Sequence, residues 1–427
     1  MLAVCAMVAQ AAEPFISFEP VADGVELRLG TISYSEQENE GVKIAIGNLR
    51  TDMQKTIGHE AAVLVGTVGS NADIDRMVKQ GLLPDLKGRR EKFIITTTAD
   101  GLPVIAGSDR RGTIYGVYEL SRQLGVSPWY WWADAPIPRH AQAYVKKGIF
   151  TDGEPAVDFR GIFLNDEAPC LTSWVKNTFG TNYGDHRFYE RVFELILRLK
   201  GNMIWPAMWG WAFYADDAEN SATADRMGII VGTSHHEPMA RNHQEYARHR
   251  KEWGAWNYQT NQQKLDQFFR EGIERMKGTE DMVTIGMRGD GDEAMGDKTD
   301  VSLMQRIVKN QRQIIKDVTR KPAEKTTQVW ALYKEVQDYY DAGFRVPDDV
   351  IMLVCDDNWG DIRRVPMGDE LKHKGGWGIY YHVDYVGAPR NTKWLNVTQT
   401  QQMFEQLSLA YDYGIQRMWI LNVGDLK

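Results

Sequence analysis

The sequence has little cysteine, no long apolar run and no excess of positive charge, and each shortage excludes a class of protein. Three cysteines occur in 427 residues. If Cys5 is lost with an N-terminal signal, Cys170 and Cys355 remain. They lie too far apart in the sequence to be assigned as a disulfide without geometry, and both are expected to be buried. No later stretch reaches the roughly 18 apolar residues of a membrane span. The net charge of −8 makes nucleic acids and membranes unexpected partners.

Several ligand-binding and catalytic motifs are also missing. No G-x-G-x-x-G loop opens a helix, and no G-x-S-x-G turn supplies a nucleophilic serine. "HHEPMARNH" (235–243) lacks the histidine spacing of H-E-x-x-H zinc sites. "DGDEAMGDKTD" (290–300) departs from a calcium loop at Ala294 and Met295. We therefore expect neither a metal ion nor an organic cofactor.

The N-terminus resembles a secretory signal. "MLAVCAMVAQAA" is small and apolar and ends in Ala-Gln-Ala, although the basic region that usually precedes it is missing. Residues 1–12 are therefore predicted to be a truncated signal peptide, with a disordered terminus as the alternative. The prediction places the mature protein in the periplasm or outside the cell.

Residues 13–150 are predicted to form a small α/β domain. Short strand-like runs, among them "KIAIG" (43–47), alternate with polar segments. The clearest helix ends near Leu124, with Gly125 available for a left-handed cap. The proline-containing "WWADAPIPRH" (131–140) then reads as a linker.

Residues 151–427 change to a repeated strand, loop and helix. Eight strands separated by amphipathic segments predict a (β/α)8 TIM-type barrel, and a doubly wound open sheet is the alternative. The expected strands are 158–165, 202–209, 228–235, 282–289, 327–333, 350–357, 376–383 and 417–423. No closing helix follows the last of them, so the sequence is expected to be a fragment.

Active-site groups of such a barrel lie at the C-terminal ends of its strands. The sequence places acids, imidazoles or tryptophans after each expected strand. Any one acid could simply cap the next helix. Their repetition favours a functional site at the C-terminal opening of the barrel, called its mouth below. The densest group is "MRGDGDEAMGD" (287–297), whose crowded carboxylates need cations, exposure or a catalytic reason. The candidate substrate-binding residues are Arg288, Asn165, Trp209, His236, Glu237, Asn358, Trp359 and His382.

Paired carboxylates together with tryptophans indicate a glycosidase. One carboxyl group protonates the leaving oxygen while another activates water or attacks. Indole rings stack on the apolar faces of sugars. Trp205 and Trp377 lie inside expected strands and are predicted to be core residues instead.

Six long stretches closely resemble glycoside hydrolase family 115. They are "FRGIFLNDEAPCLTSWV", "GNMIWPAMWGWAF", "GTSHHEPMARN", "TIGMRGDGDEAM", "WALYKEVQDYYDAG" and "CDDNWGDIRRVP". The resemblance implies an inverting α-glucuronidase that removes α-1,2-linked glucuronic acid, or its 4-O-methyl ether, from glucuronoxylan or aldouronic acids without a cofactor. Family members continue into C-terminal regions that support a homodimer.

The resemblance also implies the catalytic residues. Glu335 is expected to be the general acid and Asp292 to belong to the water-activating side, with Asp166 and Asp356 in support. Because a uronate brings its own carboxylate, a fixed cation is needed, and Arg288 has the planar fork for it. The alternative for Arg288 is an ion pair with Asp290 or Asp292.

Two other functions remain open. A hexosaminidase-like barrel enzyme could use the adjacent Asp292 and Glu293 for substrate-assisted catalysis. A carbohydrate-binding protein descended from such an enzyme would need no turnover. Release of a uronic acid, and its dependence on Glu335, would separate the three.

Overall fold

The computed structural model describes residues 14–165, 168–181, 184–385 and 398–427. The chain divides into two compact units. The first contains the residues up to Ala156 with Leu197–Lys200 and Arg226–Gly228, and the second contains the rest. Within the ranges described, no helix is long and apolar enough to span a bilayer.

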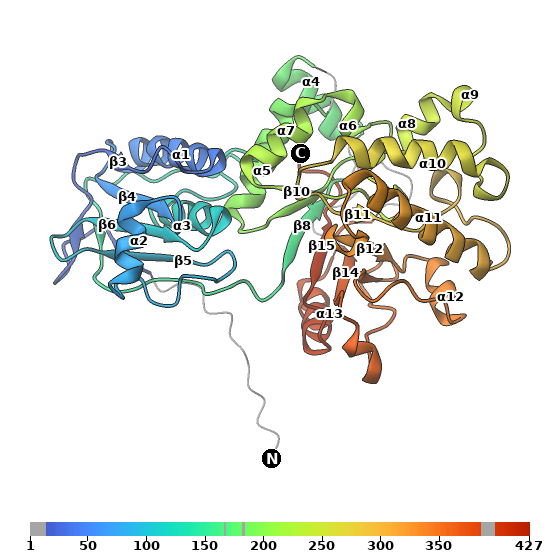
Figure 1. Ribbon diagram of the computed structural model, residues 1–427. Helices are drawn as coiled ribbons and strands as arrows, with labels where there is room; N and C mark the ends of the chain where they lie inside the picture. The colour runs from blue at the N-terminus through green and yellow to red at the C-terminus, as the bar shows by residue number, and fades with distance from the viewer. Residues whose placement is uncertain (1–13, 166–167, 182–183, 386–397) are drawn as a thin grey trace. The chain divides into compact units, whose positions relative to one another are not determined.

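The first unit contains two small sheets (Figure 1). The four-stranded sheet has the order β3-β4-β6-β5, and β5 runs antiparallel to its neighbour. The three-stranded sheet has the order β1-β7-β2. The elements are β1 (Ile16–Ser17), β2 (Val25–Glu26), β3 (Ile32–Ser33), α1 (Glu40–Thr56), β4 (Val63–Thr67), α2 (Ala72–Lys79), β5 (Phe93–Thr97), β6 (Pro103–Gly107), α3 (Arg110–Gln123) and β7 (Tyr144–Val145).

One expected strand of this unit is a helix. Residues 43–47 lie within α1, which begins after the Asn39 cap. The apolar residues Val42, Ala45, Ile46, Leu49 and Met53 are all buried, and their spacing of three and four residues is that of a helix face. The strand prediction from the alternation in "KIAIG" was therefore wrong, because the buried residues follow the helical period instead. The helix expected before the linker is confirmed as α3, and Gly125 follows it with φ 100°.

The second unit contains an eight-stranded parallel sheet in the order β10-β9-β8-β15-β14-β13-β12-β11. Every expected strand of residues 151–427 is present but shorter. Because the strands are parallel, their C-terminal ends lie along one edge. The strands are β8 (Phe159–Phe163), β9 (Met203–Trp205), β10 (Ile230–Val231), β11 (Val283–Thr284), β12 (Gln328–Ala331), β13 (Ile351–Cys355), β14 (Trp377–His382) and β15 (Met418–Asn422).

The two end strands of this order are joined by hydrogen bonds. The Met282 N–H donates to the Val231 carbonyl at 2.8 Å, and the Met239 N–H donates to the Thr284 carbonyl at 2.9 Å. The Thr284 hydroxyl donates to the Thr233 carbonyl at 2.6 Å. The sheet therefore curls so that β10 approaches β11, an arrangement consistent with the predicted barrel.

Side chains from several strands fill the interior of the curled sheet. Phe163, Met203, Trp205, Leu353 and Tyr380 belong to one buried cluster. Burial of Trp205 and Trp377 confirms their predicted core positions. Cys355 is buried as expected, whereas Cys170 is exposed, since α4 buries Leu171 and Val175 instead.

Helices alternate with these strands, and α10 packs along α11 (Figure 1). The helices are α4 (Cys170–Phe179), α5 (His186–Arg198), α6 (Phe213–Asp216), α7 (Glu219–Met227), α8 (His243–Arg248), α9 (Arg250–Trp253), α10 (Tyr258–Arg275), α11 (Val301–Thr319), α12 (Val336–Asp341) and α13 (Thr400–Asp412), with single 3-10 turns at η1 (Asp290–Asp292), η2 (Ala323–Lys325) and η3 (Gly368–Lys372).

Asp281 makes the region between β10 and β11 sensitive to pH. Its carboxyl accepts hydrogen bonds from the Val231 N–H at 3.2 Å and the Tyr214 hydroxyl at 3.0 Å. Burial raises the pKa of Asp281 to about 7. Because the folded pKa exceeds the unfolded one, the stability that Asp281 contributes is fully present below about pH 4 and is lost as the pH rises towards 7.

Replacing Asp281 with asparagine should remove part of this pH dependence. We expect the unfolding free energy of the wild type to fall by about 2–3 kcal/mol more than that of Asp281→Asn between pH 5 and pH 8. Urea unfolding at both pH values measures the difference, with Asp317→Asn, a change at a partly exposed surface acid, as control. Parallel pH profiles for wild type and Asp281→Asn would contradict the assignment.

Candidate active site

The C-terminal edge of the parallel sheet gathers most of the residues singled out in the sequence. They follow or end different strands and are brought together although up to about 200 positions separate them along the chain. Asp166 lies outside the described residues. Those described at this edge are Asn165, Trp209, His236, Glu237, Arg288, Asp292, Glu335, Asp356, Asn358, Trp359 and His382.

Arg288 lies at the centre of this edge and joins two carboxylates. Its Nε and one terminal nitrogen donate to the two oxygens of Glu335 at 2.8 and 2.7 Å. The other terminal nitrogen donates to the Asp292 carbonyl at 2.6 Å and to the Asp292 carboxylate. Every nitrogen of the buried guanidinium is therefore engaged by Asp292 or Glu335. The ion pair with Asp292, which the sequence offered as the alternative role of Arg288, is present, and a second with Glu335 accompanies it.

Asp292 is held further by two histidines that follow β10. The His235 Nε2 lies 3.0 Å from the Asp292 Oδ1, and the His236 Nδ1 lies 3.5 Å from the same oxygen. Burial and the nearby Arg288 charge lower the pKa of both histidines well below the usual range. A neutral His235 must therefore donate its Nε2 proton to the carboxylate. Asp292 Oδ2 has no partner among the described residues.

The crowded carboxylates of residues 287–297 separate into different environments. Asp290 pairs with Arg250, whose second nitrogen donates at 2.9 Å, and lies 3.0 Å from His243 Nε2. The hydrogen bond from Arg250 and its positive charge lower the pKa of Asp290. Asp292 faces Arg288, while Glu293 and Asp297 are exposed. Cations and exposure together relieve the repulsion that the sequence implied.

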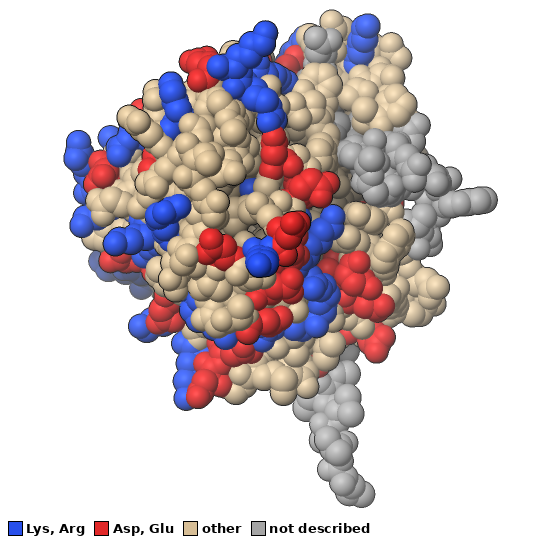
Figure 2. All heavy atoms as spheres, turned by 90° about the vertical axis from the view of Figure 1, so that its right-hand side faces the viewer, with Lys and Arg blue, Asp and Glu red and all other residues tan. Residues whose placement is uncertain are grey.

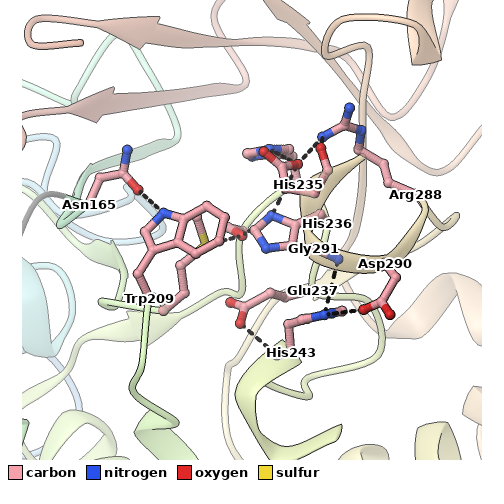
Figure 3. A network of polar contacts seen from close by, with 12 residues as sticks. Asn165, Trp209, His235, His236, Glu237, His243, Arg288, Asp290 and Gly291 are labelled. Atoms are coloured by element: carbon pink, nitrogen blue, oxygen red, sulfur yellow. Dashed lines mark hydrogen bonds and ion pairs between the residues drawn. The ribbon is translucent and has the colours of Figure 1, made fainter. Parts of the chain in front are cut away.

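Glu237 is buried beneath this group rather than open to a ligand. It is 1% exposed and accepts a hydrogen bond from the His243 N–H at 2.8 Å, at the start of α8 (Figure 3). The Asn242 amide donates to its other oxygen at 3.4 Å. Burial raises the pKa of Glu237 to about 8. These contacts support α8 and the wall that carries His243.

Asp356 and His382 form a second buried pair, from the ends of β13 and β14. The His382 Nδ1 lies 2.6 Å from the Asp356 Oδ1. The backbone N–H groups of Gly360 and His382 donate to the other oxygen at 3.1 and 3.2 Å. Both carboxylate oxygens are thus occupied, so Asp356 orients the His382 ring and the following loop.

Two tryptophans of this edge differ in their surroundings. The Trp209 Nε1 donates to Asn165 at 3.1 Å, and its ring stacks with His236 at a centroid distance of 5.8 Å (Figure 3). Trp359 is 68% exposed and contacts Tyr385 edge to face. Trp209 is a fixed wall of the site, whereas the Trp359 ring is open to solvent and to a ligand. Asn358 precedes it in the left-handed conformation, with φ 75°.

Sequence reasoning placed His235 at the end of an expected strand without giving it a role, and it missed Tyr333. The Tyr333 ring lies 4.2 Å from His235, and the Arg288 guanidinium carbon lies 5.3 Å from its centroid. Tyr333 is the last residue of the expected strand 327–333, so the strand-end rule could have found it as well. Arg250 was also missed, because it lies in α9 and its spacing from Asp290 carries no local signal.

Three other arginines of the second unit have different roles. Arg160 donates to the Val157 carbonyl at 2.7 Å and lies near the start of β8. Arg364 donates to both oxygens of Glu370. Arg363 donates to the Lys334 carbonyl at 3.0 Å and so supports the loop next to Glu335.

His235, His236 and Asp292 also form the one group of potential metal ligands found among the described residues. Their ligand atoms all lie within 4.8 Å of one another. Arg288 already contacts the Asp292 carboxylate, and its positive charge opposes a second cation there. The donor set therefore fits a metal poorly while the ion pair is intact.

Charge on the surrounding surface is mixed. On the face shown in Figure 2, basic and acidic side chains are interspersed, and acidic ones gather near its centre beside basic ones. No basic patch dominates the described part of this face. The arrangement agrees with the negative net charge of the sequence.

Comparison with known proteins identifies the family. The model of glycosyl hydrolase family 115 matches residues 152–427. A solved family GH115 4-O-methyl-α-glucuronidase, BtGH115A, described as specific for decorated arabinogalactans, is 36% identical with a TM-score of 0.86. The match covers 94% of this chain but 55% of that one, so the chain spans about half the length of that relative.

Two more distant structures share the fold alone. A mutant Streptomyces plicatus β-hexosaminidase with bound GlcNAc is 13% identical, with a TM-score of 0.56 and coverage of 95% and 84% of the two chains. A GH138 enzyme targeting pectin rhamnogalacturonan II is 12% identical, with a TM-score of 0.53 and coverage of 93% and 46%. Among curated proteins no match is found. On the family model and the 36% identical structure together, the chain belongs to glycosyl hydrolase family 115.

Proposed function

We propose that the protein is an inverting α-glucuronidase that removes α-1,2-linked glucuronic acid, or its 4-O-methyl ether, from glucuronoxylan or aldouronic acids. The observation that carries the proposal is the pair Asp292 and Glu335, held on different edges of the Arg288 guanidinium. Inverting glycosidases keep their two carboxyl groups roughly 6.5–9.5 Å apart to admit water. A guanidinium between the carboxylates supports such a separation.

The contacts of the two carboxyl groups favour different roles. Asp292 is anchored through Oδ1 and leaves Oδ2 open, which suits a base that orients water. Among the described residues, the Glu335 carboxylate has one hydrogen-bonding partner, Arg288, and 27% of its side chain is exposed. Because the side chain is partly open to water, Glu335 can take up a proton and donate it to the glycosidic oxygen while its other oxygen still accepts from Arg288, which suits the general acid.

The remaining residues are proposed to position the sugar. Trp209 and Trp359 offer stacking surfaces, while Asp356 fixes His382. No metal or organic cofactor takes part in the proposed reaction. Asn165, His236, Glu237 and Asn358 support these groups, and Asp166 is proposed as a further catalytic acid from the family resemblance.

The same proposal extends to the architecture and setting of the protein. We propose that the parallel sheet closes as a (β/α)8 barrel between β10 and β11, and that residues 13–150 form the preceding domain. Secretion or periplasmic export follows from the N-terminal signal. From the family resemblance we also propose that the protein forms a homodimer.

Two alternatives differ in substrate or in turnover. A decorated arabinogalactan is the alternative polysaccharide, because BtGH115A is described with that specificity. A hexosaminidase would need Asp292 and Glu293 to act together, but Asp292 is bound to Arg288 while Glu293 is exposed. A carbohydrate-binding protein without turnover would not need two carboxylates held by one arginine, as Asp292 and Glu335 are held by Arg288.

Product analysis tests the proposed function. The purified chain is incubated separately with glucuronoxylan, decorated arabinogalactan and chitobiose, and the released sugars are identified by chromatography and NMR. We expect 4-O-methylglucuronic or glucuronic acid from glucuronoxylan, appearing first as the β-anomer because the α-linkage is inverted. Release of GlcNAc, or of an α-anomer, would contradict the proposal, and release from arabinogalactan alone would move it to the alternative polysaccharide.

A further inference from the structure

The proposed substrate carries a carboxylate that needs its own cation. Arg288 was the expected partner, but every nitrogen of its guanidinium already donates to Asp292 or Glu335. Binding a uronate there would break ion pairs in a buried site, where an unpaired carboxylate is costly. A different cation near Glu335 would leave the pairs intact.

Lys334 is such a cation. It directly precedes Glu335 after β12, and its Nζ lies 5.1 Å from the centroid of the Tyr333 ring. The Arg288 guanidinium carbon lies 5.3 Å from the same ring. Among the described residues, no carboxylate pairs with the Lys334 ammonium and no acceptor receives a hydrogen bond from it.

We propose that Lys334 is the residue that binds the carboxylate of the uronic acid, and that Arg288 instead holds the two catalytic carboxylates. This inference rests on the proposed function for the identity of its ligand. It assigns the acidic substrate to a lysine that the family resemblance and the strand-end pattern left without a role.

The backbone fixes the direction of the Lys334 side chain. Its φ of 47° lies in the left-handed region, which non-glycine residues rarely adopt and which is found often at functional sites. The Lys334 carbonyl accepts hydrogen bonds from Arg363 at 3.0 Å and from the Gln337 N–H at 3.3 Å. Tyr333 is buried beside it. The two hydrogen bonds to the Lys334 carbonyl and the buried Tyr333 therefore define this conformation.

The charges around Lys334 leave room for an anion. Partial burial, followed by repulsion from Arg288, lowers the pKa of Lys334, and Glu335 and Glu293 only partly offset this. An added carboxylate would relieve that repulsion. A neutral hexose, which carries a CH2OH group where the uronate has its carboxylate, would gain nothing from this charge.

Binding of free sugars tests the inference without requiring turnover. D-Glucuronate and D-glucose are titrated into the wild-type chain, Lys334→Gln and Lys372→Gln, and binding is followed by NMR. Lys372 is an exposed lysine in η3, before β14 and thus at the opposite end of the sheet. We expect Lys334→Gln to weaken glucuronate binding by about ten- to a hundredfold, as for the loss of a charge-assisted contact, and to leave glucose binding and the melting temperature unchanged.

Other results would decide against the inference. Unchanged glucuronate binding in Lys334→Gln, an equal loss for both sugars, or no preference of the wild type for glucuronate would each overturn it. Lys334-dependent glucuronate binding without release of uronic acid from any polysaccharide would leave the inference standing and contradict the proposed function. The two failures are therefore distinguishable.

Discussion

Replacing Glu335 with glutamine should lower kcat for release of glucuronic acid from an aldouronic acid by about a thousandfold, within the range for a general acid. Glutamine keeps the size and one acceptor for Arg288 but cannot donate a proton to the glycosidic oxygen. The xylose leaving group depends on that proton, because an unprotonated sugar alkoxide is a poor leaving group. Steady-state rates with the aldouronic acid measure the loss.

A substrate that needs no proton separates the roles of the two carboxyl groups. Glu335→Gln should retain most of its activity on α-glucuronosyl fluoride, whereas Asp292→Asn should lose activity on both substrates because water is no longer activated. Glu324→Gln, at an exposed acid before the same strand, is the matched control. An equal loss on both substrates in Glu335→Gln would contradict its assignment as the acid.

Replacing Arg288 with methionine should have the largest effect on the fold. The change leaves the Asp292 and Glu335 carboxylates facing each other without their shared cation, and Asp292 is only 14% exposed. Loss of one partner of a buried pair costs about 3 kcal/mol or more, and Glu335 can regain part of this by turning to water. We expect a lower unfolding free energy at pH 7.5 and no detectable turnover.

Arginine geometry can be separated from charge at this position. Arg288→Lys keeps the charge but cannot donate to two carboxylates from a planar fork, so we expect it to restore stability in part and turnover hardly at all. Urea unfolding and uronate release are measured for both variants. Wild-type turnover in Arg288→Lys would show that one point charge suffices. It would contradict the proposal that the planar guanidinium must hold both carboxylates.

Much of the second unit could be predicted because local pattern and tertiary structure agree there. Short apolar runs separated by amphipathic segments gave the position of each strand, and parallel strands necessarily bring their C-terminal ends to one edge. The first unit shows the limit of that reasoning. In α1, the run "KIAIG" alternates locally, but the packing of Val42 and Leu49 on one face makes it a helix.

The sequence predicted which residues make up the candidate site, but not which of them contact one another. The sequence placed Arg288, Asp292 and Glu335 at one mouth, and all three lie together. It offered Glu237 as a ligand contact, whereas Glu237 supports α8 from within the wall. A strand-end position indicates where a residue lies, but not whether its side chain points to the mouth or to the next helix.

The sequence by itself determined which types of side chain lie at the mouth, because the position of each strand along the chain and the residues that follow it can both be read locally. Only the tertiary structure decided the partners. Asp290 pairs with Arg250, and Arg288 pairs with Glu335, which lies 47 positions away in the chain. Lys334 has no anionic partner among the described residues. Charge pairing depends on distances of a few ångströms between residues far apart in the chain, and no local periodicity records those distances.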